Sequence, residues 1–211
     1  MGLFSCFHKN QSPEEEFWGW FKDYGQEFVS LGGVSDERIY SLLDPLAEHL
    51  EEYCAGLTFE IGYDETSKTY ELVISADGNK KLFPQVEKLA GDAPVIKNWK
   101  ITAFRQPKSN QWPIQYQGYT FDPAKIFFYP LGNGSPDLTK INIEVVYPDY
   151  EGANHNLFLG GTFLLLDALI GEKSTELDIA HLDVSKTPDN TGEYKLYPLS
   201  QLREYIKSKK Q

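Results

Sequence analysis

Residues Glu71–Pro107 decide the fold of this chain, and they read ELVISADGNKKLFPQVEKLAGDAPVIKNWKITAFRQP. The apolar, β-branched run at the start of this stretch predicts a strand, which the breakers of ADGN end. Apolar residues at helical spacing then predict a helix over about 79–92, with Pro84 in its first turn. The run WKITAF predicts another strand. We expect these hydrophobic residues to form core, and Arg105 follows the last of them.

The residues just before this stretch extend it into a larger unit. Residues 57–63, LTFEIGY, alternate apolar and polar side chains, which predicts a strand with one buried face. The turn residues of DETSK connect this run to its partner, TYELVIS. The order of strand, strand, helix and strand predicts a ββαβ unit.

Two helices are predicted ahead of this unit. Ser12 and Glu15 have the spacing of a capping box, with Pro13 at the first helical position. An aromatic stripe follows at helical spacing, and we interpret it as core, with Trp20 largely buried. The members of the stripe are Phe17, Trp20, Phe21, Tyr24 and Phe28.

The second predicted helix runs from about Asp36 to Cys54, and Pro45 is expected to kink or split it. One side of this helix is apolar, whereas its other side is acidic. The acidic side carries Glu48, Glu51 and Glu52.

The same order of elements recurs in the second half of the chain. KIFFYPL and TKINIEVVYP are predicted strands, joined by a hairpin turn at Gly134. A buried helix is predicted over about 154–172, where Gly160 and Gly161 allow close packing. TELDIAHLDVS is predicted to be the closing strand, and a C-terminal helix follows.

The predicted fold class is therefore α+β. We expect two ββαβ units that form antiparallel-rich sheet, with an N-terminal helical hairpin and a C-terminal helix. A single composite domain over 1–211 is favoured, with possible internal halves 1–107 and 108–211.

Composition argues against several classes of function. The formal net charge of the 211 residues is −11, and the Lys and Arg residues are scattered, so nucleic-acid binding is not expected. A basic protein partner matches this charge better, although the charge also serves solubility alone. No apolar run is long enough to span a membrane. Cys6 and Cys54 lie far apart, which favours a reducing, cytoplasmic location.

Two places in the sequence are candidate sites. The first is an aromatic loop with Trp112, Tyr116 and Tyr119, because Trp and Tyr are favoured at interfaces. Arg105 lies at its mouth. The alternative is that this loop folds back over the sheet.

The second candidate is the cluster of Asp149, Glu151 and His155, at the predicted N-terminus of the buried helix. Carboxylates beside an imidazole are the groups that general acid–base catalysis uses, although such neighbours are also common on surfaces. The four histidines fall in four predicted elements, and no metal or cofactor motif is present. We therefore expect neither a bound metal nor a cofactor.

Several segments resemble a family of uncharacterised bacterial proteins. The resemblance rests on FWGWF, LTFEIG, ELVISADG with LFPQVEKL, WKITAFRQP and LLLDALIGE, in this order over most of the chain. The start MGLFSCFHKN is outside the pattern. The resemblance implies no established activity. It does imply that Arg105, Asp167, Gly171 and Glu172 are candidates for structural or functional importance.

These observations favour a small, acidic, cytoplasmic binding protein without catalysis. One version is an immunity-type or antitoxin-like protein that masks a basic partner. The alternative is a hydrolase that uses Asp149, Glu151 and His155. A structural or assembly factor is the third possibility.

Overall fold

The computed structural model describes residues 11–31, 36–108, 113–132, 140–188 and 194–210. The fold is α+β, as predicted. The chain forms two compact units, Met1–Ala103 (unit 1) and Phe104–Gln211 (unit 2), and each is described by itself.

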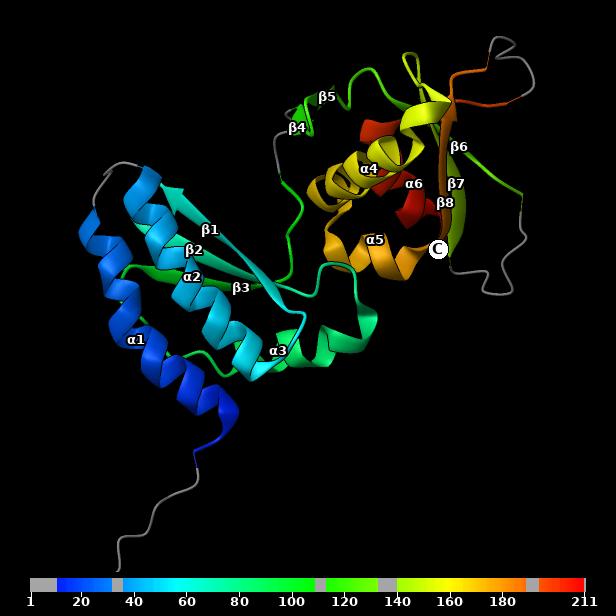
Figure 1. The fold of residues 1–211 in the computed structure, drawn as a ribbon. Helices are drawn as coiled ribbons and strands as arrows, with labels where there is room; N and C mark the ends of the chain where they lie inside the picture. The colour runs from blue at the N-terminus through cyan, green and yellow to red at the C-terminus, as the bar shows by residue number, and fades with distance from the viewer. Residues whose placement is uncertain (1–10, 32–35, 109–112, 133–139, 189–193, 211) are drawn as a thin grey trace, which may run out of the picture. The chain divides into compact units, whose positions relative to one another are not determined.

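Unit 1 contains a helical hairpin followed by a ββαβ arrangement (Figure 1). Its elements in chain order are α1 (Pro13–Leu31), α2 (Asp36–Tyr53), β1 (Thr58–Asp64), β2 (Thr69–Ser75), the 3₁₀ turn Lys80–Leu82, α3 (Phe83–Gly91) and β3 (Trp99–Ala103).

The sheet of unit 1 has the strand order β1-β2-β3, and this confirms the first predicted ββαβ unit. β1 pairs antiparallel with β2, whereas β2 pairs parallel with β3. Leu72 lies opposite both Ile61 and Ile101 in register, so these side chains share one face of the sheet. That face meets α1, because the indole N–H of Trp99 donates to the carbonyl of Gly25 at 3.0 Å.

Helix α1 begins at the predicted capping box. The backbone N–H of Glu15 donates to the Ser12 hydroxyl at 3.2 Å, and the N–H of Ser12 donates to the Glu15 carboxylate at 3.0 Å. Two N–H groups that have no partner within the helix are thereby satisfied. Helix α2 continues through Pro45 and is not split.

The structure leaves Trp20 half-buried, so this side chain is not part of the fully buried core. The buried tryptophan is its neighbour Trp18, which is 3% exposed and donates its indole N–H to the carbonyl of Leu89 at 2.8 Å. The apolar stripe of α1 is therefore rotated toward Trp18. The aromatic spacing did not distinguish the two residues, since both flank the same helix face.

Unit 2 also has an α+β arrangement. It contains a small β-hairpin, a larger sheet and helices on one side of that sheet (Figure 1). The strands are β4 (Ile114–Tyr116), β5 (Tyr119–Phe121), β6 (Phe127–Pro130), β7 (Ile141–Tyr147), β8 (Ile179–Lys186) and β9 (Tyr197–Pro198). The helices are α4 (His155–Ile170), α5 (Glu172–Asp178) and α6 (Leu202–Lys209).

The larger sheet of unit 2 has the order β8-β7-β6-β9 and contains the second predicted ββαβ arrangement. β6 and β7 pair antiparallel, with Phe128 opposite Val145, and β7 pairs parallel with β8. The predicted turn at Gly134 lies outside the described residues.

One boundary in this unit was predicted wrongly. The segment Glu172–Asp178 forms α5, so the closing strand begins at Ile179 and Leu177 is exposed on a helix. Gly171 ends α4 with a φ of 90°, a conformation that favours glycine. Its carbonyl then accepts the backbone N–H of Thr175 at 2.9 Å, which starts the new helix.

The paired glycines of α4 make room for the β4–β5 hairpin. A Cβ atom at Gly160 would lie 2.9 Å from the Tyr116 hydroxyl, and one at Gly161 would overlap the ring of Phe121. Both aromatic side chains belong to the core of unit 2 or pack against it. The glycines were predicted to allow close packing, and the hairpin supplies the neighbour.

Candidate functional site

The three residues that the family resemblance singled out, Arg105, Asp167 and Glu172, come together in unit 2. Nη1 of Arg105 lies 3.4 Å from Oδ2 of Asp167. The backbone N–H of Arg105 donates to the Glu172 carboxylate at 3.1 Å, and the N–H of Glu172 donates to the Arg105 carbonyl at 3.0 Å. These contacts join the segment that begins unit 2 to the junction between α4 and α5.

Burial controls the chemistry of this charged cluster. Glu172 is fully buried and Asp167 is 8% exposed. Burial raises the pKa of Asp167 to about 6, although hydrogen bonding from Thr175 and the charge of Arg105 oppose the increase. Since the three groups satisfy one another inside unit 2, we interpret the cluster as a structural tie and not as a binding site.

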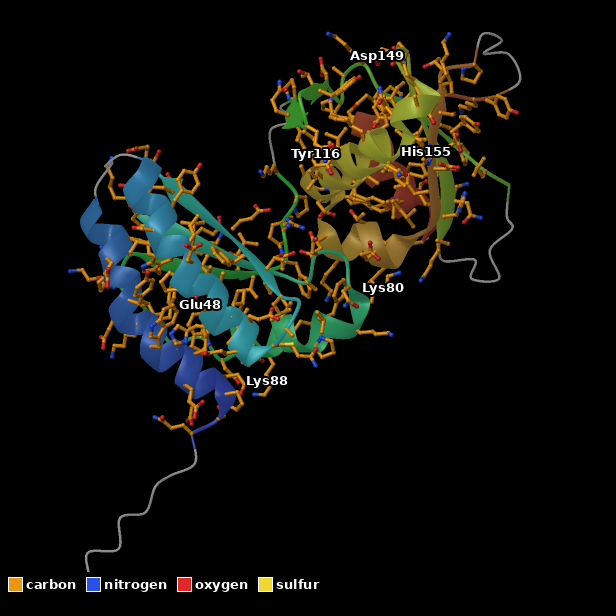
Figure 2. The ribbon with its side chains drawn as sticks, in the orientation of Figure 1. Glu48, Lys80, Lys88, Tyr116, Asp149 and His155 are labelled. Atoms are coloured by element: carbon orange, nitrogen blue, oxygen red, sulfur yellow. The ribbon has the colours of Figure 1, made fainter. Side chains whose placement is uncertain are left out.

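Two of the three aromatic residues of the predicted loop pack against the core of unit 2, and the third lies outside the described residues. Tyr116 and Tyr119 are half-buried and pack against the core of unit 2, beside α4. Figure 2 shows Tyr116 next to this helix. Trp112 lies outside the described residues. The loop therefore folds back on its own unit, as in the alternative interpretation, but it packs on helix α4 and not over the sheet as that interpretation expected.

The structure does not join the proposed hydrolase residues to one another. Nδ1 of His155 lies 2.9 Å from the Tyr150 hydroxyl, and its Nε2 lies 3.4 Å from Oδ1 of Asp183. Glu151 instead accepts a hydrogen bond from Asn154. Among the described residues, no hydrogen bond or ion pair links His155 to Asp149 or Glu151.

Most of the net charge of the protein lies on the helical hairpin of unit 1. Residues 13–53 contain eleven Asp and Glu against two Lys and Arg, so this segment carries a charge of −9 of the total −11. Glu48, Glu51 and Glu52 are exposed on α2, and Figure 2 labels Glu48 there. Charge that is concentrated in this way produces a local negative potential.

An aromatic stack lies along the seam between the two helices of this hairpin. The ring of Trp20 lies 3.8 Å from that of His49 and 4.6 Å from that of Tyr24, measured between centroids. Nδ1 of His49 is 3.3 Å from Oε2 of Glu52, and the Tyr24 hydroxyl donates to the Leu42 carbonyl at 3.3 Å. We call Trp20, Tyr24 and His49 the seam stack.

The seam stack differs from the buried aromatic core of unit 1 in one respect. The indole N–H groups of Trp18 and Trp99 both donate to backbone carbonyls, whereas that of Trp20 donates to none of the described residues. Trp20 is therefore half-buried, with no hydrogen bond from its indole N–H to a described residue. Burial, together with the nearby charges of Glu27 and Asp44, raises the pKa of Tyr24.

The start of the hairpin is held by a second set of polar contacts. Tyr53 of α2 donates its hydroxyl to the Glu14 carboxylate at 3.0 Å, and Nζ of Lys88 lies 3.2 Å from Oε2 of Glu14. Burial opposes ionisation of Glu14, but hydrogen bonds, including those from Lys88 and Tyr53, outweigh it and lower the pKa. The two helices are thereby fixed relative to each other.

Sequence reasoning missed the seam stack as a candidate site. Trp20 was assigned to the core, and His49 was not among the candidate residues. The partition of charge between residues 13–53 and the rest of the chain was the signal that could have directed attention to this hairpin.

No group of three or more His, Cys, Asp or Glu side chains within the described ranges could hold a metal ion. No described helix has the length and apolarity needed to cross a membrane.

Comparison of the chain with protein-family models, with curated proteins and with solved structures finds no match. The resemblance to a bacterial family therefore stays a prediction.

Proposed function

We propose that this protein is a small, acidic, cytoplasmic binding protein that uses its α1–α2 hairpin to cover a basic surface of a protein partner. Masking of a toxin by an immunity-type or antitoxin-like protein is the concrete version of this function. The observation that carries the proposal is the charge of −9 on residues 13–53 together with the half-buried seam stack.

The two features of the hairpin have different physical roles. Exposed carboxylates attract a basic surface over distances of about one Debye length, roughly 8 Å at physiological salt, and thereby raise the association rate. Half-buried aromatic side chains supply contact area that slows dissociation. The hairpin combines both features on adjacent residues, since His49 of the stack is followed by Glu51 and Glu52.

An arginine side chain would fit this surface well. A guanidinium group stacks on aromatic faces and pairs with carboxylates at the same time. Trp20 is half-buried and contacts His49 of the neighbouring helix, which also carries Glu48 and Glu52. We therefore expect the partner to present arginines to the seam stack.

The test begins with capture of partners from the native lysate and continues with binding kinetics on the purified partner. Replacement of Glu48, Glu51 and Glu52 by Gln should lower the association rate by about tenfold at low salt and leave the dissociation rate nearly unchanged. The matched control replaces three exposed acidic residues outside the hairpin, Glu65, Glu151 and Glu204, and should change the association rate much less.

Trp20→Ala should affect the other rate constant. Loss of an aromatic anchor should speed dissociation by about tenfold with little change in association. If the hairpin triple variant and its control lowered the association rate equally, the charge of the hairpin would not direct binding and would serve solubility alone. If no partner is captured and the protein hydrolyses a substrate in a broad screen, with loss of activity in His155→Ala, the hydrolase alternative replaces the proposal.

A further inference from the structure

Unit 2 contains a partly open cavity of about 240 Å³ at the end of β5, beside the start of α4. Aromatic rings and carboxylates both line it, with one lysine at its rim. The lining includes the aromatic residues Tyr119, Phe121, Tyr147 and Phe158 and the charged residues Asp122, Asp149 and Lys125.

The aromatic part of this cavity is rigidly held. Phe121, Tyr147 and Phe158 are 2–3% exposed and contact one another edge to face, with centroids 5.0–5.9 Å apart. Tyr119 is half-buried, and its hydroxyl accepts a hydrogen bond from the Asn154 side chain at 3.2 Å. The hydroxyl of Tyr147 forms a hydrogen bond with the hydroxyl of Thr162 in α4. Each tyrosine hydroxyl therefore already has a hydrogen-bond partner within unit 2, and the rings form the floor and wall of the cavity.

The rim of the cavity carries two carboxylates. Asp149 is exposed and makes no hydrogen bond or ion pair with any described residue. Its charge is nevertheless close to the floor, because it contributes, after burial, to the raised pKa of Tyr147. Figure 2 labels Asp149 beside the start of α4.

The protein already places an ammonium group at this rim. Nζ of Lys125 lies 3.6 Å from Oδ2 of Asp122, and the Lys125 side chain is 79% exposed. Such an exposed pair contributes little stability, so the lysine is free to move aside. A second cation entering the cavity would find no described residue paired with Asp149.

We propose that this cavity binds an alkylammonium group. Aromatic rings attract cations through their negative faces, and carboxylates add charge complementarity, whereas both features disfavour anions. The ligand is either a free small ammonium compound or the side chain of a lysine. The proposal is independent of the hairpin, since every residue of the cavity belongs to unit 2.

The full-length protein, labelled with ¹⁵N, is titrated with two pairs of compounds while backbone amide shifts are recorded. Choline is compared with its neutral isostere 3,3-dimethyl-1-butanol, and N-acetyl-lysine-methylamide is compared with the norleucine analogue. The cation of at least one pair should shift the amides around Asp122 and Asp149 and bind about tenfold more tightly than its neutral partner. The pair that responds identifies a quaternary ammonium or a lysine as the source.

Two variants sharpen the result. Asp149→Asn should weaken binding of the cation about fivefold or more, whereas Lys125→Met should strengthen it because the competing ammonium is removed. Lys207→Met, at an exposed lysine of α6 that does not line this cavity, is the control and should have no effect. Equal binding of cation and neutral isostere, or no localised shifts up to about 20 mM of either cation, would overturn the proposal.

Discussion

The carboxyl group of Asp167 is nine-tenths buried and faces Arg105, Glu172 and Thr175. In the folded protein its pKa is raised to about 6 by burial, whereas in the unfolded chain it should be close to the ordinary value of 3.8. The folded state therefore binds a proton more tightly than the unfolded state between these two values. This residue costs stability above pH 6, and the cost disappears as the pH falls toward 4.

The free energy of unfolding should reveal this cost when wild type is compared with Asp167→Asn. The difference in stability between them should change in favour of wild type by up to roughly 3 kcal/mol as the pH is lowered from 7 to 4. Urea titrations at several pH values measure it. The comparison with wild type is needed because other carboxylates act in the opposite direction. Glu14, for example, has a lowered pKa, so the stability that it contributes to the folded protein is lost in acid. A difference that is independent of pH would contradict the raised pKa.

Neighbouring tryptophans in α1 should respond very differently to truncation. Trp18→Ala removes a buried ring and leaves the Leu89 carbonyl without its donor, so it should cost about 3–5 kcal/mol of unfolding free energy. Trp20→Ala removes a half-buried ring that makes no hydrogen bond to a described residue, and should cost about 1–2 kcal/mol. Denaturant unfolding of both variants tests this order, and equal losses would place Trp20 in the core after all.

Helix α4 and the β4–β5 hairpin pack so closely that one helical position tolerates no side chain. Gly161→Ala places a Cβ atom inside the ring of Phe121, which is part of the core, so either the ring or the hairpin must shift. We expect a loss of about 1–3 kcal/mol in unfolding free energy. Thermal or urea unfolding measures it.

Gly19→Ala is the matched control for this prediction. Gly19 also lies inside a helix, α1, but a Cβ atom there would meet nothing within 4 Å. The same substitution should therefore stabilise the protein by up to about 1 kcal/mol, because alanine has the higher helix propensity. If both variants were stabilised, the hairpin would not be packed on Gly161.

Each of the two units of the chain has its own sheet and its own buried side chains, so the units can be examined as separate folding entities. Trp18, Trp20 and Trp99 all belong to unit 1, and the remaining tryptophan, Trp112, is removed by a Trp112→Phe background. Tryptophan fluorescence then reports on unit 1, whereas far-ultraviolet circular dichroism reports on both units.

We expect these two signals to give unfolding curves that do not coincide in urea. Leu165→Ala, a core change in unit 2, should shift the circular dichroism curve and leave the fluorescence midpoint nearly unchanged. Coincident curves, with both midpoints lowered by Leu165→Ala, would show that the 211 residues unfold as one cooperative domain.

The sequence by itself determined the secondary structure and its order, because those features depend on neighbours a few residues apart. The capping box at Ser12, the helical spacing in 79–92 and the strand alternation in 57–63 all act locally. The ββαβ order in each half followed from them. The end of the buried helix was predicted to within two residues, but α5 was missed, because a glycine that ends one helix does not show that another helix begins directly after it.

Only the tertiary structure decided which side chains meet. Arg105 contacts Asp167 and Glu172, more than sixty residues away, through the path of the chain around α4. His155 is paired with Asp183 because β8 lies beside β7, and not with the carboxylates near it in sequence. Trp20 stacks on His49 only because α1 and α2 pack side by side. Local periodicity places a residue on a face of its element, but packing decides what covers that face.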